Sequence, residues 1–303
     1  MDMDNPGLTR ESKLVLGTLV LAATVMLLNE TTLSVALPVI MDSFGVTAAT
    51  AQWLTTGFML TMAVVIPTTG FIIERLTTRQ VFITAFVFFL GGTLVAALAP
   101  VFLVLLGGRV LQAAGTALIM PLLMTTVMNV VPPSMRGSFV GMMSVVISLA
   151  PAFGPTVSGF ILNYFSWHFV FWFMVPFVVF ILLVGVKYIS NVGESTEKPF
   201  DIISVPLAAI GFGGLVYALS DIETLMAGSF IPIIVGVAAI IALVAFVLRQ
   251  LSLGKRDQAF LDLRVFAVPG FAIAIILIMV IFGLLLGLVT VLPIYLQKAL
   301  LVT

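Results

Sequence analysis

Nine long apolar runs constrain this chain more than any other feature of its sequence. They lie near residues 14–37, 50–72, 80–99, 102–127, 138–162, 168–189, 203–220, 229–248 and 269–293. A helix needs about 20 apolar residues to cross the hydrocarbon core of a bilayer. The strands of membrane barrels are much shorter and alternate in polarity, so they do not fit these runs. The sequence therefore predicts an all-α membrane protein, a helical bundle with about nine transmembrane helices.

The composition excludes several other classes of protein. Hydrophobic residues make up 61% of the chain and charged residues 9%, whereas a soluble domain carries about 25% charged residues. The net charge is zero, which gives no indication of nucleic-acid binding, and there is no cysteine for disulfides, thiolate catalysis or metal binding. No phosphate loop, nucleophile elbow or metal-ligand cluster is visible. We therefore expect neither an enzyme nor a cofactor.

The basic residues predict the orientation of the chain in the membrane. Cytoplasmic loops carry an excess of Lys and Arg, and a cytoplasmic N-terminus leaves only Lys298 outside. The first run follows an acidic, polar segment without a cleavage site, so we expect a retained span rather than a signal peptide. The cytoplasmic segments then hold Arg10, Lys13, Arg75, Arg79, Arg136, Lys187, Lys198, Arg249, Lys255, Arg256 and Arg264.

The spacing of the runs predicts the domain organisation. The first six spans form two triplets of similar hydropathy, as in a pseudo-symmetric six-helix bundle. In chain order the predicted parts are a cytoplasmic segment (1–13), the six-helix half (14–189), a linker (190–202), two additional spans (203–248), a cytoplasmic loop (249–268) and one further span (269–303).

Glu30 is the strongest single indication of function. An acid inside a span is costly and marks a functional site by default, and Arg109 should lie at a similar depth. Burial favours the neutral acid and a nearby arginine favours the carboxylate, so this pair could load and release a proton. The alternative is a fixed ion pair that only joins two helices.

Further polar residues accompany this pair. Arg109, Gln112 and Thr116 share one face of the fourth span, and Asn29 precedes Glu30. We expect these side chains to line a substrate cavity, although a hydrogen-bonding face between helices would show the same pattern.

Two other segments could act in gating. The fifth span carries small residues at helical spacing, together with Pro151 and Pro155, which favours a pliable gate helix or simple packing. The turn between the second and third spans, Gly70–Arg79, holds Glu74, Arg75 and Arg79. Such charges usually reflect topology, but with Arg136 they could also form a cytoplasmic gate.

Several of these segments resemble motifs of the fourteen-helix drug:proton antiporter family of the major facilitator superfamily. LNETTLSVALP (Leu28–Pro38) and QWLTTGFML (Gln52–Leu60) are similar to its first-helix and second-helix signatures. Gly70–Arg79 resembles the superfamily's cytoplasmic gating motif, with Glu74 in place of Asp and Thr77 in place of Gly. Gly108–Gly115 resembles the fourth-helix RxxQG motif.

The resemblance continues to the end of the chain. APAFGPTVSG (Ala150–Gly159) is similar to the antiporter motif of exporters and keeps Gly154, Pro155 and Gly159, while Ala150 and Ser158 replace family glycines. FLDLRVF (Phe260–Phe266) and LPIYLQ (Leu292–Gln297) resemble segments around the ninth helix. The resemblance implies that complete members contain five further helices.

The resemblance also implies a function. We expect the full-length form to export hydrophobic, amphipathic or cationic drugs across the bacterial cytoplasmic membrane in exchange for protons, driven by the proton gradient without a cofactor. Glu30 would exchange protons with substrate and Arg109 would tune Glu30. The alternatives are an uptake symporter or facilitator of the same fold, and a truncated membrane protein that acts through partners.

Overall fold

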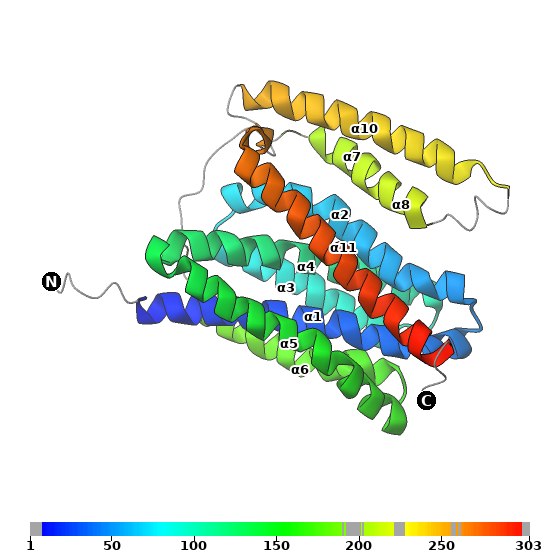
Figure 1. Ribbon diagram of the computed structural model, residues 1–303. Coiled ribbons are helices and arrows are strands. Elements are labelled where there is room, and N and C mark those ends of the chain that lie inside the picture. Colours follow the sequence, from blue (N-terminus) through cyan, green and yellow to red (C-terminus); the bar gives the residue numbers. More distant parts are fainter. Residues whose placement is uncertain are drawn as a thin grey trace. The chain divides into compact units, whose positions relative to one another are not determined.

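The computed structural model describes residues 8–189, 191, 201, 203–220, 228–255, 259 and 262–298. Within them every regular element is a helix, which confirms the all-α fold class (Figure 1). The first six helices are α1 (Arg10–Phe44), α2 (Ala48–Arg75), α3 (Thr78–Ala97), α4 (Phe102–Val130), α5 (Pro133–Tyr164) and α6 (His168–Tyr188).

Threonines begin the first three of these helices. Thr9, Thr47 and Thr77 each accept a hydrogen bond from a backbone N–H of the first turn. This capping gives a partner to a backbone N–H group that the start of a helix otherwise leaves unpaired. At α3 the side chain of Gln80 bonds back to the Thr77 backbone, which completes a capping box. Thr77 therefore has a local structural role at the start of α3.

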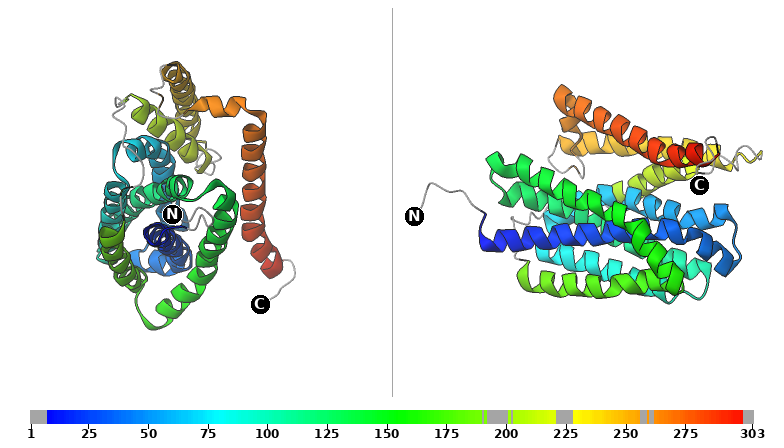
Figure 2. Two further views of the ribbon diagram at one scale, coloured as in Figure 1. Left: turned by 90° about the vertical axis from the view of Figure 1, so that its left-hand side faces the viewer. Right: turned by 60° about the horizontal axis from the view of Figure 1, so that its bottom comes forward.

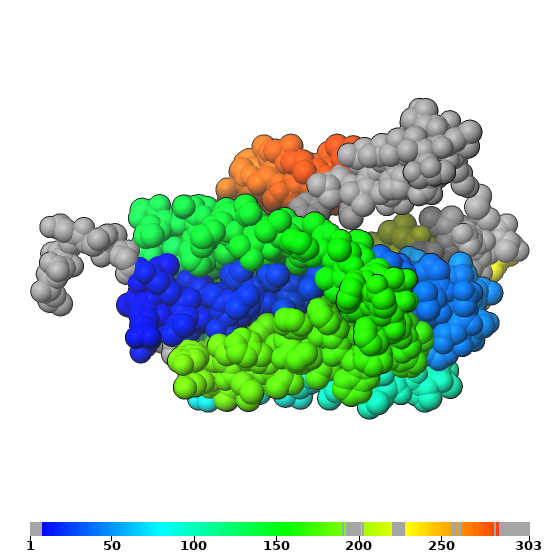
Figure 3. Space-filling view, turned by 90° about the horizontal axis from the view of Figure 1, so that it is seen from below, coloured from blue at the N-terminus to red at the C-terminus, as the bar shows by residue number. Residues whose placement is uncertain are grey.

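Helix α1 lies at the centre of the group. It packs against α2, α4, α5 and α6, and α3 packs against α4 and α6. Figure 2 shows α1 enclosed by the other helices when the group is viewed along its axes. Figure 3 shows the face on which α5 and α6 flank α1 and converge toward their connecting turn. The buried side chains of α1 are therefore within reach of several neighbouring helices.

Two hydrophobic clusters fill this group at different heights. The first includes Leu16 of α1, Phe82 of α3 and Leu122 of α4, and the second includes Leu33 of α1 and Leu105 of α4. Along α1, the first cluster ends at Met26 and the second begins at Leu33. The interval between the clusters holds most of the buried polar residues discussed below.

The remaining helices are α7 (Ser204–Ala208), the π-helical segment η1 (Ala209–Gly213), α8 (Gly214–Ser220), α10 (Ile231–Gly254), the 3-10 helix η2 (Leu263–Ala267) and α11 (Pro269–Lys298). Gly211 and Gly214 let the seventh span approach Leu243 and Ala239 of α10. Tyr217 lies against Trp53 of α2, with ring centroids 5.8 Å apart. The two additional spans, the seventh span and α10, are therefore joined to the six-helix group through α2.

The chain divides into two compact units, Met1–Phe246 and Val247–Thr303. In the second unit Asp262 accepts a hydrogen bond from the Arg264 backbone and forms an ion pair with its side chain at 2.9 Å. The ring of Phe266 contacts Phe271 at the start of α11. These contacts fix the entry into the last helix.

The sequence predicted about nine spans, and the described residues contain seven helices that are long and apolar enough to cross a membrane: α1 to α6 and α10. The shorter apolar stretch Ser204–Leu219 coincides with the seventh predicted span, and α11 begins where the ninth does. α10 continues to Gly254, into the predicted cytoplasmic loop. Most of the 190–202 linker lies outside the described residues.

Candidate functional site

A buried polar layer separates the two hydrophobic clusters. α1 contributes Asn29 and Thr32, α3 contributes Thr93, and α4 contributes Arg109 and Gln112; each is at most 1% exposed. Buried polar groups are costly unless they are hydrogen-bonded to one another. The contacts within this layer therefore decide what it can do.

Arg109 is the centre of the layer. Its Nη1 donates to Asn29 Oδ1 at 3.2 Å and to Gln112 Oε1 at 2.8 Å. Gln112 Nε2 donates to Thr93 Oγ1 at 2.9 Å, and the Thr93 hydroxyl donates to the Phe89 carbonyl oxygen. This chain of hydrogen bonds joins α1, α4 and α3, and its side-chain acceptors are all neutral.

Close helix packing brings these residues together. A β-carbon at Gly92 of α3 would lie 2.6 Å from the backbone nitrogen of Gln112, and one at Gly108 would lie 2.8 Å from the backbone nitrogen of Ala96. Such distances exclude any side chain larger than hydrogen. Small residues allow helix backbones to approach in a membrane, and here they set the distance over which Gln112 reaches Thr93.

Phe58 of α2 closes another side of the layer. The guanidinium carbon of Arg109 lies 4.1 Å from the centroid of the Phe58 ring, and Phe58 is 1% exposed. The neighbouring Gly57 leaves room for Leu106 of α4, whose Cδ1 would be 3.1 Å from an added β-carbon. Sequence reasoning did not identify Phe58 or Thr93, because neither stands out in an apolar run.

Glu30 lies beside this layer and is half-buried. Its carboxyl group interacts electrostatically with Arg109, but within the described residues no ion pair joins the two. Arg109 Nε and Asn29 Nδ2 are buried and have no hydrogen-bond partner among those residues. The expectation that Glu30 and Arg109 lie near each other agrees with this geometry, whereas the direct contact of Arg109 is with Asn29.

The three residues expected to line a substrate cavity are packed between helices. Asn29 and Gln112 belong to the hydrogen-bond chain, and the Thr116 hydroxyl donates to the Gln112 carbonyl oxygen of its own helix. All three are at most 3% exposed. The geometry is that of a hydrogen-bonding interface between helices, and cavity lining stays a prediction.

The residues of the expected cytoplasmic gate lie at or near helix ends. Glu74, Arg75 and Arg79 are exposed at the α2–α3 turn, and Gly70 is exposed in the last part of α2. Arg136 at the start of α5 donates to two carbonyl oxygens at the end of α4, from Nη2 to Met128 at 2.7 Å and from Nε to Val131 at 3.0 Å. Those bonds tie α5 to α4. A gating role for these residues stays a prediction.

The α5 motif presents two different faces. Gly154 is buried against α1, where a β-carbon would lie 2.7 Å from Thr31 Cβ. Pro151, Pro155 and Gly159 are exposed. Gly154 thus positions α5 beside the residue that follows Glu30, while the antiporter role assigned to the whole motif stays a prediction.

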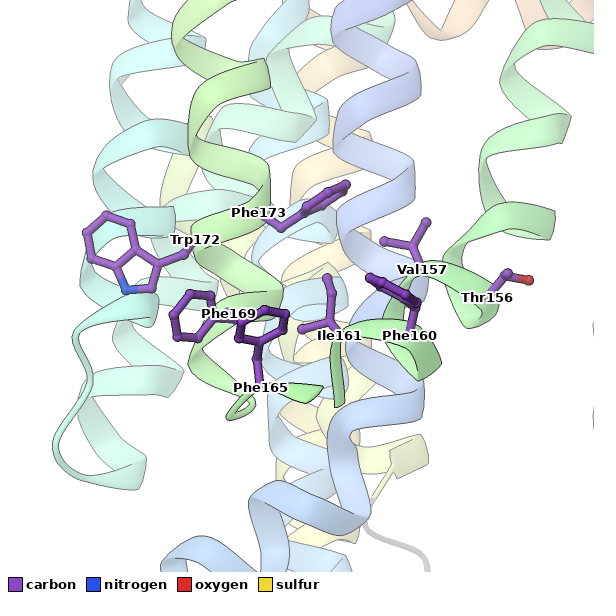
Figure 4. Close-up of a pocket in the computed structure, with 8 residues that line it drawn as sticks. All are labelled: Thr156, Val157, Phe160, Ile161, Phe165, Phe169, Trp172 and Phe173. Carbon is purple, nitrogen blue, oxygen red and sulfur yellow. The ribbon is translucent and has the colours of Figure 1, made fainter. Parts of the chain in front are cut away.

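An apolar pocket of about 580 Å³ lies at the turn between α5 and α6. Figure 4 shows its aromatic side chains gathered around this turn, with Thr156 as the one polar residue in the lining. The aromatic residues are Phe160, Phe165, Phe169, Trp172 and Phe173. Sequence reasoning did not predict this pocket, although aromatic residues are dense along this segment.

Metal-binding chemistry is not visible in the part of the chain that the structure describes. There, no group of three or more His, Asp or Glu side chains is close enough to hold a metal ion.

Comparison with known proteins places these features in a family. The sequence profile of the Major Facilitator Superfamily matches residues 19–301. The chain is 41% identical over 286 residues to the lincomycin resistance protein LmrB of Listeria monocytogenes, covering 94% of this chain and 60% of that protein. It is 29% identical to the multidrug export protein EmrB of Haemophilus influenzae, covering 92% of this chain and 54% of EmrB.

A solved structure shows the same fold. The human organic anion transporter MFSD10 superimposes with a TM-score of 0.55 at 16% identity, over 69% of this chain and 55% of that one. The chain thus spans about 60% or less of the length of the relatives it matches. Its multi-pass helical architecture, its motifs and these matches agree, and the chain belongs to the Major Facilitator Superfamily.

Proposed function

We propose that this chain, in its full-length form, is a drug exporter of the bacterial cytoplasmic membrane that exchanges substrate for protons. The observation that carries the proposal is a wholly buried arginine beside a half-buried acid with which it forms no ion pair. The names of the relatives, lincomycin resistance and multidrug export, support a drug substrate. The basic residues of the predicted inner loops support a cytoplasmic N-terminus.

Glu30 would carry the proton in this scheme. In the protonated state it is neutral and compatible with its partly apolar surroundings. After deprotonation its carboxylate could accept a hydrogen bond from Asn29 Nδ2, a buried donor without a partner among the described residues. A charged hydrogen bond of this kind is stronger than a neutral one. Substrate binding and proton release would then compete for the same region of α1.

Glu30→Gln tests this assignment. The native full-length polypeptide and the variant would be compared in everted membrane vesicles, with ethidium and lincomycin as transported probes. We expect proton-driven uptake into the vesicles to be abolished, because glutamine cannot release a proton, while exchange of drug for drug across the membrane continues.

The same vesicles test the proposed cytoplasmic N-terminus. A tag at the N-terminus should be accessible to protease on the outside of these everted vesicles.

Glu11→Gln is the matched control, since Glu11 is an exposed acid in the first turn of the same helix. Its proton-driven uptake should equal that of the unmodified protein. Unchanged uptake in Glu30→Gln would remove Glu30 from the mechanism. Movement of drug in the same direction as protons would instead favour an uptake symporter.

A further inference from the structure

Arg109 keeps a full positive charge in an unusual environment. It is 1% exposed, and its hydrogen bonds go to the amide oxygens of Asn29 and Gln112. A buried charge is costly unless it is compensated. Two neutral acceptors compensate only part of that cost, and Nε has no partner among the described residues. Some other group has to stabilise the guanidinium.

The ring of Phe58 is placed to do so. Its centroid is 4.1 Å from the guanidinium carbon, well inside the distance of about 6 Å at which the negative face of an aromatic ring attracts a cation. Both groups are buried, so water does not weaken the attraction. α2 approaches α4 closely at Gly57, immediately before Phe58, which fixes the ring over Arg109.

An aromatic ring differs from a carboxylate in one important respect. A carboxylate would neutralise Arg109 and end its influence on Glu30. The ring stabilises the cation without adding a charge, so the positive potential of Arg109 still acts on the acid one helix away.

We propose that Phe58 is a positioning residue, whose ring holds Arg109 charged and apart from Glu30 so that the acid can take up and release its proton. This inference rests on the proposed function, because it assigns Phe58 a role in the same proton exchange. Gln112 also holds the guanidinium by accepting a hydrogen bond from Nη1, and Thr93 in turn holds the Gln112 amide.

Fluorinated phenylalanines at position 58 provide the sharpest test. Each added fluorine weakens the negative face of the ring and changes its shape little. In the vesicle assay described above, we expect proton-driven uptake by the native full-length polypeptide to fall stepwise with one, two and three fluorines. The total loss should be about 2- to 30-fold, the range expected for a cation–π contact between exposed and desolvated limits. Drug-for-drug exchange should change much less.

Side-chain replacement gives a second, independent series. Phe58→Leu keeps an apolar side chain but removes the ring, so proton-driven uptake should fall by a similar factor. Phe58→Tyr and Phe58→Trp keep an aromatic face and should retain more of the proton-driven uptake than Phe58→Leu. The fluorinated series remains informative even where Phe58→Leu fails to fold.

Phe82 of α3 is the matched control, because it is an equally buried phenylalanine of the same bundle and belongs to the first hydrophobic cluster rather than to the polar layer. Fluorination there should leave uptake unchanged. Equal losses at positions 58 and 82, or no loss at position 58, would overturn the role of Phe58. Glu30→Gln, assayed in parallel, separates the two proposals. If the Glu30→Gln protein exports normally, the proposed function fails. If the Glu30→Gln protein is inactive while the proteins fluorinated at position 58 are normal, only the Phe58 inference fails.

Discussion

Helices α4 and α5 both carry several glycines, but the structure uses them differently. Gly108 and Gly115 of α4 lie against the backbone of α3, where an added β-carbon would overlap main-chain atoms. On α5, Gly137, Gly141 and Gly159 have nothing within 4 Å of the β-carbon position. Gly154 is intermediate, because the atoms that it approaches belong mainly to the Thr31 side chain.

The comparison shows that a small residue in a membrane helix can have either of two structural roles. In α4 it allows a second backbone to come close enough for Arg109 and Gln112 to join three helices. In α5 three of the four glycines have open space at the β-carbon position. The spacing of small residues alone does not distinguish the two cases, and substitution experiments can.

Gly115→Ala should have the largest effect. The new methyl group would lie 2.8 Å from the backbone nitrogen of Phe89 and close to the Ala85 carbonyl oxygen, and backbone atoms cannot rotate away. Overpacking of this kind costs about 1–3 kcal/mol. Thermal unfolding in detergent should show a clearly lowered midpoint for this variant. Gly159→Ala is the control, expected to match the unmodified protein; equal losses in both would contradict the comparison.

Gly154→Ala should have an intermediate effect. Its methyl group would meet the Thr31 hydroxyl and Cβ, and a side chain yields more easily than a backbone. We expect a loss of about 1 kcal/mol and partial recovery in the double variant with Thr31→Ala, because the hydroxyl is then removed. A double-mutant cycle on the unfolding midpoints measures the coupling. Strictly additive losses would show that the two residues do not interact.

Thr93→Val should have the smallest effect of the three. It removes the acceptor of the Gln112 amide at nearly constant volume. Hydrogen bonds between membrane helices contribute about 0.6 kcal/mol on average, so the unfolding midpoint should fall only slightly. Thr116→Val is the matched control, because the Thr116 hydroxyl bonds to its own helix backbone. A larger loss in Thr116→Val would contradict the importance of the link between α3 and α4.

The helices of this protein were largely predictable from the sequence, and the contacts within the site were not. The runs near 102–127 and 138–162 agree with α4 (Phe102–Val130) and α5 (Pro133–Tyr164), because length and apolarity determine where a chain can cross a bilayer. The depth of a residue within the membrane was also predictable, since each residue adds 1.5 Å of rise along a helix. That is why Glu30 and Arg109 could be expected near each other.

Helix rotation was not predictable in the same way. Successive residues of a helix point about 100° apart, so depth alone does not decide whether Asn29 or Glu30 contacts Arg109. Phe58 contacts the arginine only because α2 approaches α4 at Gly57. Such a contact depends on the packing of α2 against α4, two helices that are not consecutive in the sequence. The composition of α2 or of α4 does not indicate which helix it packs against.

The glycine contacts between α3 and α4 also have a mechanical consequence. Two helices separated by a layer of long side chains can slide past each other by changing rotamers. Where Gly92, Gly108 and Gly115 bring two backbones into direct contact, there is no such layer to deform. Any rearrangement of this bundle therefore has to carry α3 and α4 together as one rigid unit, with Arg109 attached to it.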